Sequence, residues 1–292
     1  MNLYSSKEMT DLLERHDFFF KKNLGQNFLM NESIAARIAD ASYETVPQNK
    51  KCLAIEIGPG AGSLTLQLAN RFDSVLALEI DPHLIGVLAE SLADKQNARV
   101  VHTDALAFDF SSVEKDYPDH SIAVCSNLPY YITSEIIMRL LESGLPITSV
   151  TVLIQKEAAV RLTSKPGSEQ YGAITAAVNY YAKSEKLFTV GPGNFIPRPK
   201  VDSAVLRLTP YAEPAVKVEN QDLFFKLIRA AFGNRRKTLS NALSSAFKDR
   251  YSKEVILEVL EQANVDPTRR GETLTLEEYA NISNIFTSRE EK

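Results

Sequence analysis

The stretch Cys52–Gly62, CLAIEIGPGAG, decides the fold because a short aliphatic run ends in a glycine-rich turn. The run CLAIEI has the length and composition of a buried strand, and a helical pattern begins directly after the last glycine. Glycines at such a turn permit a tight backbone and let a ligand approach it closely. The stretch therefore predicts a ligand-binding turn at the carboxyl end of a buried strand.

The same alternation of strand-like and helical segments continues beyond this turn. Further strands are expected at SVLALEI, RVVHT, SIAVCSN and SVTVLI, with helices near residues 63–71, 82–92 and 134–143. Farther along, EKLFTV and SAVLRLTP are expected to add antiparallel strands. This order predicts an α/β fold, a Rossmann-like sheet with helices on both faces, which binds its ligand outside the carboxyl ends of the strands.

A second region begins after a linker-like stretch, TPYAEPAVKVEN, at residues 209–220. Proline and polar residues dominate this stretch, which is typical of a connection between domains. Three-to-four spacing of apolar residues then marks four helical segments, DLFFKLIRAAF, TLSNALSSAF, KEVILEVLEQA and LEEYANISNIF. We therefore expect a sheet domain at residues 1–210 and a small all-helical domain at residues 211–292.

The composition is that of a soluble globular protein, with 44% hydrophobic and 24% charged residues. No apolar run approaches the ~20 residues of a membrane span, and charges interrupt the N-terminus where a signal peptide needs an apolar core. We expect a cytoplasmic protein without membrane contact. Cys52 and Cys125 lie inside apolar strand-like runs and the histidines are widely spaced, so neither a disulfide nor a metal site is expected.

The net charge of -4 argues against a nucleic-acid partner only at face value. Charges act over roughly 8–10 Å in physiological salt, so a local cluster matters more than the sum. Arg235, Arg236 and Lys237 form such a cluster between two of the predicted C-terminal helices. They are candidates for holding nucleic-acid phosphates, and the alternative is a solvated, charged helix end.

The glycine spacing distinguishes two classes of cofactor. A nicotinamide site has the fingerprint G-x-G-x-x-G around a pyrophosphate, whereas this turn reads G-x-G-x-G and follows Glu56. A carboxylate beside the turn repels a pyrophosphate but attracts a sulfonium or an ammonium group. The turn therefore favours S-adenosylmethionine over a nicotinamide cofactor.

Acidic residues after the next two strands extend this predicted site. Glu79 ends the second strand about 20 residues past the glycines, where a carboxylate can accept both ribose hydroxyls of a nucleoside. Asp104 follows the third strand and can accept a hydrogen bond from the adenine amino group of the same cofactor. Each residue also has an ordinary interpretation, Glu79 as a solvated strand-end acid and Asp104 as a turn former or helix cap.

The fourth strand runs into Ser126–Tyr131, SNLPYY, the most informative short motif of the chain. The amino nitrogen of adenine is a poor nucleophile because its lone pair is delocalised into the ring. Asn127 can accept one amino hydrogen through its side-chain oxygen and Leu128 the other through its carbonyl, which frees the lone pair to attack a methyl group. Pro129 stiffens the turn and Tyr130 offers a face for base stacking. The alternative is a strand-ending turn with core tyrosines.

Together these motifs resemble those of the ribosomal RNA adenine dimethyltransferase family over nearly the whole chain. The matching blocks are Lys22–Leu29 (KNLGQNFL), Glu56–Gly62, Asn127–Tyr130, Asn194–Pro197, Pro199–Ser203, Arg235–Leu239 and Arg270–Leu274. Members of that family use S-adenosylmethionine to dimethylate N6 of two adjacent adenosines in the 3′-terminal hairpin loop of small-subunit rRNA. The resemblance implies the same reaction here, a role in biogenesis of the 30S subunit, and a monomer acting on that subunit or its precursor.

The resemblance also implies roles for individual residues in cofactor binding. Asn27 and Leu29 are expected to cover the cofactor from the N-terminal segment. Gly58 is expected to lie against its methionine part. Glu79 is expected to bind the ribose, and Asp104 is expected to bind the adenine amino group.

Two further roles concern the target base, and one residue departs from the family pattern. Asn127 is expected to touch both the methyl donor and the acceptor. Phe195 is expected to stack on the face of the target adenine opposite Tyr130, although its pattern alone predicts a core residue. Arg198 departs from the family, which has proline or a small residue there, and this puts at most one RNA contact in doubt.

Three other functions compete with this one. A sister group methylates adenine in large-subunit rRNA and confers macrolide resistance, but the LGQNFL and RRKTL segments favour the small-subunit enzymes. A non-catalytic ribosome assembly factor could use the same fold, although intact Asn127, Pro129 and Tyr130 argue for activity. A DNA adenine methyltransferase is expected to carry a dedicated sequence-reading domain instead of this small helical one.

Overall fold

The computed structural model describes residues 1–21 and 24–290. Lys22 and Asn23, which open the KNLGQNFL motif, lie outside the described residues. Within the described part of the chain, no helix combines the length and the apolar character that crossing a membrane requires.

The chain forms two compact units, which we call the sheet unit and the helical unit. The sheet unit comprises residues 1–159 and 184–210, and the helical unit comprises residues 160–183 and 211–292. The functional division after residue 210 stays a prediction. In the structure, the segment 160–183 groups with the C-terminal helices.

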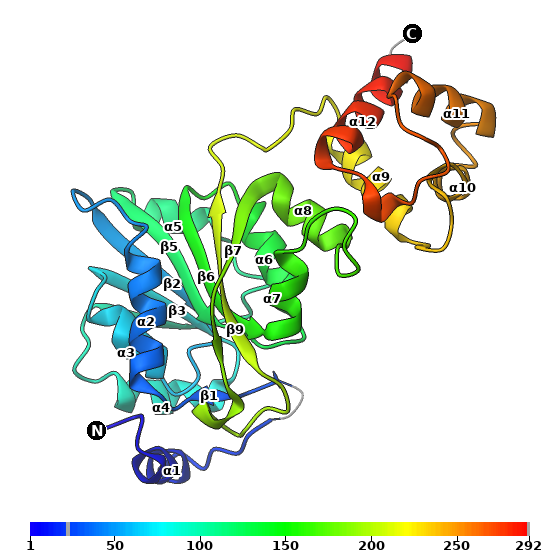
Figure 1. The fold of residues 1–292 in the computed structure, drawn as a ribbon. Helices are drawn as coiled ribbons and strands as arrows, with labels where there is room; N and C mark the ends of the chain where they lie inside the picture. Colours follow the sequence, from blue (N-terminus) through cyan, green and yellow to red (C-terminus); the bar gives the residue numbers. More distant parts are fainter. Residues whose placement is uncertain (22–23, 291–292) are drawn as a thin grey trace. The chain divides into compact units, whose positions relative to one another are not determined.

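The sheet unit is built on a seven-stranded sheet with the strand order β4-β3-β2-β5-β6-β9-β7 (Figure 1). Its strands are β2 (Lys51–Ile57), β3 (Ser74–Glu79), β4 (Ala98–His102), β5 (His120–Asn127), β6 (Ile147–Gln155), β7 (Ala182–Val190) and β9 (Ser203–Pro210). The strands β2 to β6 pair in parallel, and β9 pairs antiparallel with β6. The predicted parallel sheet with an antiparallel addition is confirmed.

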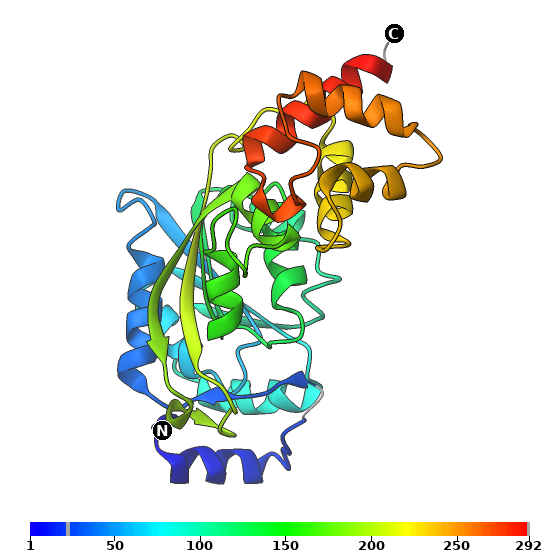
Figure 2. The same ribbon diagram turned by 45° about the vertical axis from the view of Figure 1, so that its right-hand side comes forward.

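Helices cover both faces of this sheet (Figures 1 and 2). Those predicted after the first, second and fourth strands are confirmed as α3 (Ser63–Ala69), α4 (Pro82–Ser91) and α6 (Thr133–Leu141). Three other helices of this unit were not predicted, α1 (Ser6–Arg15), α2 (Glu32–Tyr43) and α5 (Ser111–Asp116). The buried residues of α2 are mostly small and α5 is too short to show a helical period, so neither of these two gives a strong apolar pattern.

The strand order reverses beside β2, which pairs with β3 on one side and β5 on the other. The carboxyl ends of the three strands therefore meet at one edge of the sheet, the position where ligands bind in open α/β folds. This brings together Ile57, Glu79 and Asn127, the last residues of those strands. The site motifs thus converge although they lie far apart in the sequence.

The N-terminal segment returns to the same edge of the sheet. Helix α1 (Ser6–Arg15) buries Met9, Leu12 and Leu13 in a cluster that includes apolar residues of α4. The short strand β1 (Phe28–Leu29) then pairs antiparallel with β8 (Phe195–Ile196). We call residues 24–29, which lead into and include β1, the strap.

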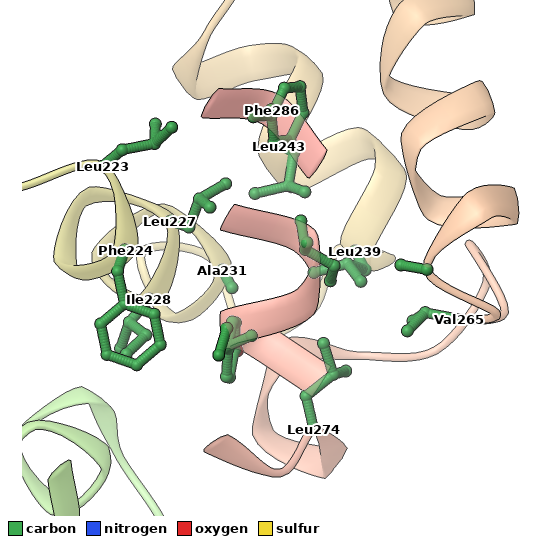
Figure 3. Packing of buried hydrophobic residues seen from close by; sticks show 14 of the residues in the cluster. Leu223, Phe224, Leu227, Ile228, Ala231, Leu239, Leu243, Val265, Leu274 and Phe286 are labelled. Carbon is green, nitrogen blue, oxygen red and sulfur yellow. The ribbon is translucent and has the colours of Figure 1, made fainter. Parts of the chain in front are cut away.

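The helical unit has an apolar core of its own (Figure 3). Its helices are α8 (Ala173–Tyr181), α9 (Gln221–Phe232), α10 (Leu239–Ala246), α11 (Lys253–Gln262) and α12 (Leu276–Glu290); α7 (Lys156–Leu162) spans the boundary between the units. Three-to-four spacing places Leu223, Leu227 and Ala231 on the buried side of α9. Burying a leucine of this kind stabilises the fold by about 1.5–3 kcal/mol. The four helices predicted beyond the linker are confirmed.

Candidate active site

A cavity lies at the carboxyl ends of β2, β3 and β5. Five segments contribute most of its lining, residues 24–29, 56–61, 78–80, 103–106 and 127–132. Every residue predicted for cofactor binding or catalysis lines it, namely Asn27, Leu29, Gly58, Glu79, Asp104, Asn127, Leu128 and Tyr130. The structure therefore brings these predicted site residues together.

The glycine turn has a backbone that few other residues adopt. Gly58 has a φ of 68° and Gly60 a φ of 61°, both in the left-handed region that favours glycine. A Cβ atom at Gly60 would also lie 2.9 Å from ring carbons of Phe28 in the strap. Glycine at this position therefore lets the strap pack directly on the turn.

Glu56 is buried under the turn, and no cation of the described residues compensates its charge. Its side chain lines the cavity, the residue is 1% exposed, and Oε2 has no hydrogen-bond partner among the described residues. Burial, together with the negative charge of Glu79, raises the pKa of Glu56 to about 8. A positively charged ligand in the cavity would favour the ionised form of this carboxyl group.

The carboxyl group of Glu79 is held by backbone amides. Oε1 accepts from the Asp81 N–H at 2.8 Å and Oε2 from the Gly60 N–H at 3.3 Å. Burial raises its pKa, and these two hydrogen bonds offset part of that effect. Glu79 is therefore a fixed acceptor at the cavity wall, and not a solvated strand-end acid.

Asp104 has the geometry of its ordinary interpretation and also lies at the cavity, and its predicted contact with the adenine amino group stays a prediction. Its Oδ1 accepts from the Leu106 N–H at 2.8 Å, the geometry of a turn former. The residue is exposed and also lines the cavity. Its turn geometry does not prevent the carboxylate from facing a ligand.

The NLPY segment lines the cavity with two residues that carry hydrogen-bond acceptors, Asn127 and Leu128. The Asn127 amide nitrogen, Nδ2, donates to the carbonyl of Asn27 at 2.8 Å. Because a carbonyl can only accept, the amide nitrogen faces Asn27 and the oxygen Oδ1 lies on the other side of the amide. The Leu128 N–H donates to the Leu153 carbonyl at 3.1 Å, while no hydrogen bond from the described residues reaches the carbonyl oxygen of Leu128.

The two aromatic candidates lie in different surroundings. The Tyr130 hydroxyl is 2.9 Å from Ser203 Oγ, which fixes the ring at the cavity wall. Phe195 is 4% exposed, packs in an apolar cluster with Leu29 and is not among the residues that line the cavity. Its predicted stacking on the target base stays a prediction. Sequence reasoning overlooked Tyr131, which lines the cavity and is 56% exposed.

The ribosomal RNA adenine dimethylase family matches this chain in sequence over residues 17–282. The chain belongs to this family. The resemblance inferred from the motifs is thereby confirmed, and this family member is an rRNA methyltransferase.

Several curated relatives of this family member share the name ribosomal RNA small subunit methyltransferase A. Ribosomal RNA small subunit methyltransferase A of Alkaliphilus metalliredigens is 46% identical over 289 residues, covering 99% of each chain. Among solved structures, the 23S rRNA methyltransferase ErmE is 27% identical with a TM-score of 0.66, over 87% of this chain and 97% of that one. A dimethyladenosine transferase from Plasmodium falciparum is 24% identical with a TM-score of 0.76, over 90% and 98%, which shows a shared fold.

Sequence reasoning also missed the partners of Asp81 in this family member. Lys21 Nζ lies 2.9 Å from Oδ1, and Gln26 Nε2 donates to Oδ2 at 2.9 Å. Burial opposes ionisation, but the hydrogen bonds from Lys21 and Gln26 outweigh it and hold the pKa of Asp81 below its usual range. The sequence Asp81-Pro82 signals a helix start, but a pairing with a lysine 60 residues away has no local signal.

The basic turn of the helical unit divides into two kinds of residue. Arg235 is held within the unit, since its guanidinium bonds the carbonyl of Glu169 at 2.8 Å and lies 3.4 Å from the Glu272 carboxylate. Arg236 and Lys237 are exposed. The predicted contact of all three residues with RNA stays a prediction.

Proposed function

We propose that this chain is an S-adenosylmethionine-dependent rRNA (adenine-N6,N6)-dimethyltransferase acting on two adjacent adenosines in the 3′-terminal hairpin loop of small-subunit rRNA. The observation that carries the proposal is a single cavity lined by Asn127 and Leu128, which carry two acceptors, and by Glu56, whose Oε2 has no partner among the described residues. The first pair suits an aromatic amine, and the carboxyl group suits a cation. The names of the curated relatives support small-subunit rRNA as the substrate.

The described residues fit S-adenosylmethionine by charge and by position. The orphaned Oε2 of Glu56 is matched by the positive charges that this cofactor carries. When bound, the cofactor supplies an electrophilic methyl group on its sulfonium. The assignments are the ribose to Glu79, the adenine amino group to Asp104, the methionine part to Gly58, and the covering contacts to Asn27 and Leu29.

The chain's own residues activate the amine. Asn127 accepts one N6 hydrogen at Oδ1 and Leu128 accepts the other at its carbonyl, which frees the nitrogen lone pair. The carbonyl of Asn27 keeps the Asn127 amide from turning its oxygen away. The methylated nitrogen then loses a proton to water, so no strong general base is required. In the second transfer N6 carries one hydrogen, and one acceptor is sufficient.

The target adenosine enters the cavity unstacked, at a cost that is smallest for an unpaired nucleotide. Tyr130, held by Ser203, offers a stacking face. Stacking by Phe195 requires the ring to leave its buried position. Arg235, Arg236 and Lys237 are the proposed phosphate contacts on the 30S subunit or its precursor. The acting form is a cytoplasmic monomer.

Two alternative functions compete with this proposal, methylation of large-subunit rRNA and a non-catalytic role in ribosome assembly. The fold likeness to ErmE does not distinguish large-subunit from small-subunit methylation, because a large-subunit methyltransferase has the same fold. Curated relatives named as small-subunit enzymes, at 44–46% identity over nearly the whole chain, favour the small-subunit substrate. A non-catalytic assembly factor does not need two acceptors held at a cavity wall.

The test is transfer of tritiated methyl groups to purified small subunits that lack the modification, followed by nucleoside analysis. We expect labelled N6,N6-dimethyladenosine in small-subunit rRNA and none in a matched large-subunit sample. Label confined to large-subunit rRNA would transfer the assignment to the resistance class. Binding to the subunit with no label in either RNA would support the assembly-factor alternative.

A further inference from the structure

The strap Leu24–Leu29 contributes one wall of the cavity and is fixed at its two ends. At its C-terminal end, Leu29 pairs with Phe195 between β1 and β8. Near its N-terminal end, Gln26 bonds to Asp81, the residue that precedes α4. Asn27 lies between these two attachments.

Lys21, Gln26 and Glu79 form hydrogen bonds with the carboxylate or the backbone N–H of Asp81. Lys21 Nζ and Gln26 Nε2 each lie 2.9 Å from a different carboxylate oxygen, and the side chain is 0% exposed. The Lys21 N–H also donates to Gln26 Oε1 at 2.7 Å, which closes a ring of three residues. On the other side, the Asp81 N–H donates to Glu79 Oε1 at 2.8 Å.

Helix capping alone does not need this arrangement. The capping bond uses only Oδ1, which accepts from the His83 N–H at 3.1 Å, and Asn or Ser caps a helix as well as Asp does. Burying a carboxylate costs free energy unless it is paired and hydrogen-bonded. Here Lys21 and Gln26 supply that pairing from the N-terminal segment, so the charge of Asp81 serves the strap.

A continuous set of contacts leads from this carboxylate to the proposed catalytic amide. Asp81 fixes Gln26, and the next residue, Asn27, accepts from Asn127 Nδ2 at 2.8 Å. Asn27 is itself tied to the strap because its Nδ2 donates to the Gly25 carbonyl at 2.9 Å. A displacement of the strap therefore moves the carbonyl that orients Asn127.

We propose that Asp81 is a positioning residue for methyl transfer, which holds the strap through Lys21 and Gln26 and thereby fixes the amide of Asn127. The inference rests on the proposed function, because it gives Asn127 its role. It adds a coupling between the wall that covers the cofactor and the acceptor that faces the target amine. We call the contacts of Asp81 with Lys21 and Gln26 the latch. Loss of the latch should weaken cofactor binding and slow methyl transfer together.

The main test is Asp81→Asn, which keeps the capping oxygen Oδ1 and the side-chain size. It replaces Oδ2 by an NH2 group, which faces the donor Nε2 of Gln26. We expect the Kd for S-adenosylhomocysteine to rise about tenfold and kcat to fall about tenfold. The KM for the small subunit should change less than twofold, because the variant leaves the RNA-binding residues untouched. The matched control is Glu90→Gln on the same helix, which removes the ion pair to Arg15 without touching the strap.

Two further variants separate positioning from simple loss of structure. Asp81→Asn combined with Gln26→Glu exchanges donor and acceptor, and should recover most of the lost affinity and rate. Lys21→Met removes only the partly exposed partner and should give a smaller loss in the same direction. A double variant no better than Asp81→Asn, with both folded as judged by circular dichroism, would overturn the proposal.

Amide hydrogen exchange in the ligand-free protein tests the latch independently of catalysis. Exchange across residues 24–29 should be faster in Asp81→Asn and unchanged in Glu90→Gln. If the unmodified protein methylates no RNA, the proposed function fails while this measurement still decides whether Asp81 holds the strap. Equal exchange in all three proteins, or an unchanged kcat in Asp81→Asn, would refute the inference.

Discussion

Glu56 in the sheet unit is buried and Glu278 in the helical unit is half-buried, and the two carboxyl groups have different surroundings. Glu278 is paired with Arg269 and accepts from the Thr275 N–H, so its pKa lies below the usual range although burial opposes this. Among the described residues Glu56 has no such cation, and burial raises its pKa. The helical unit thus pairs Glu278 internally, whereas the cavity leaves Glu56 for a ligand to pair.

The same contrast holds for two glycines. Gly60 leaves room for the Phe28 ring of the strap and keeps the turn open to the cavity. Gly271 lies against the backbone of Ala231, where a Cβ atom would come within 2.8 Å of the carbonyl oxygen. The first glycine serves a binding turn, and the second serves a packed helix contact. Substitutions in the two units should therefore separate function from stability.

The largest expected effect is on activity in the sheet unit. Asn127→Ala removes a fixed acceptor for the amine, and kcat should fall about 10²–10³-fold, the usual cost of losing an aligned polar group at a reacting centre. Thermal stability should stay near that of the unmodified protein, because the residue is only partly buried. Single-turnover methylation of small subunits measures the rate. A variant that methylates at the normal rate would remove Asn127 from the mechanism.

The next effect belongs to the helical unit. Gly271→Ala forces a methyl group against the Ala231 backbone and should destabilise the unit by about 1–3 kcal/mol. The Kd for S-adenosylhomocysteine should not change. Chemical denaturation measures the first quantity and calorimetry the second. Gly191→Ala is the matched control, since its Cβ meets nothing nearer than 4.0 Å; an equal loss in the control would show that packing at Gly271 is not the cause.

Glu56→Gln should move stability and binding in opposite directions. The folded pKa of about 8 lies above the ordinary value of 4.5, so the folded state holds an extra proton between these values and loses stability as pH rises through that window. The variant lacks this loss and should have the higher melting temperature at pH 8. Its affinity for S-adenosylmethionine should be about tenfold lower, because the ionised carboxyl is missing.

The pH dependence of binding supplies the check on that prediction. A cationic ligand favours ionised Glu56, so in the unmodified protein affinity should rise with pH up to about 8, with proton release on binding below it. Calorimetry in buffers of different ionisation enthalpy measures the released proton. Proton release that persists in Glu56→Gln would assign it to another group.

The sequence predicted the elements whose signals are local. The strand-turn-helix around Gly58, the NLPY turn and the helices with a clear apolar face all appear where expected, because each depends on neighbouring residues. Convergence of Glu79, Asp104 and Asn127 was predictable from parallel strand order. The pairing of Lys21 with Asp81 was not, because it depends on how the N-terminal segment returns to the sheet. Burial of Phe195 followed from its pattern, and its proposed contact with RNA came from the family resemblance alone.

The smallest effects concern the basic turn, residues 235–237. Its three cations are exposed, and Arg235 is also bonded within the helical unit. Arg235 bonds the carbonyls of Glu169 and Tyr171, so Arg235→Ala should lower the melting temperature of the helical unit. Replacing Arg236 and Lys237 together by Ala should leave stability within about 0.5 kcal/mol, as exposed substitutions usually do. The same double variant should bind the small subunit more weakly and reduce the salt slope of its affinity by about 2, one unit for each lost phosphate contact.

Comparing the two variants decides what the turn does, because a fold residue and a phosphate contact respond to salt differently. An Arg235→Ala protein that is still folded at the assay temperature should lose about 1 unit of the salt slope, because Arg235 is itself exposed and is one of the three proposed phosphate contacts. If Arg235→Ala lowers the melting temperature but keeps the salt slope of the unmodified protein, its guanidinium serves the fold alone. The RNA contacts of this turn would then rest on Arg236 and Lys237.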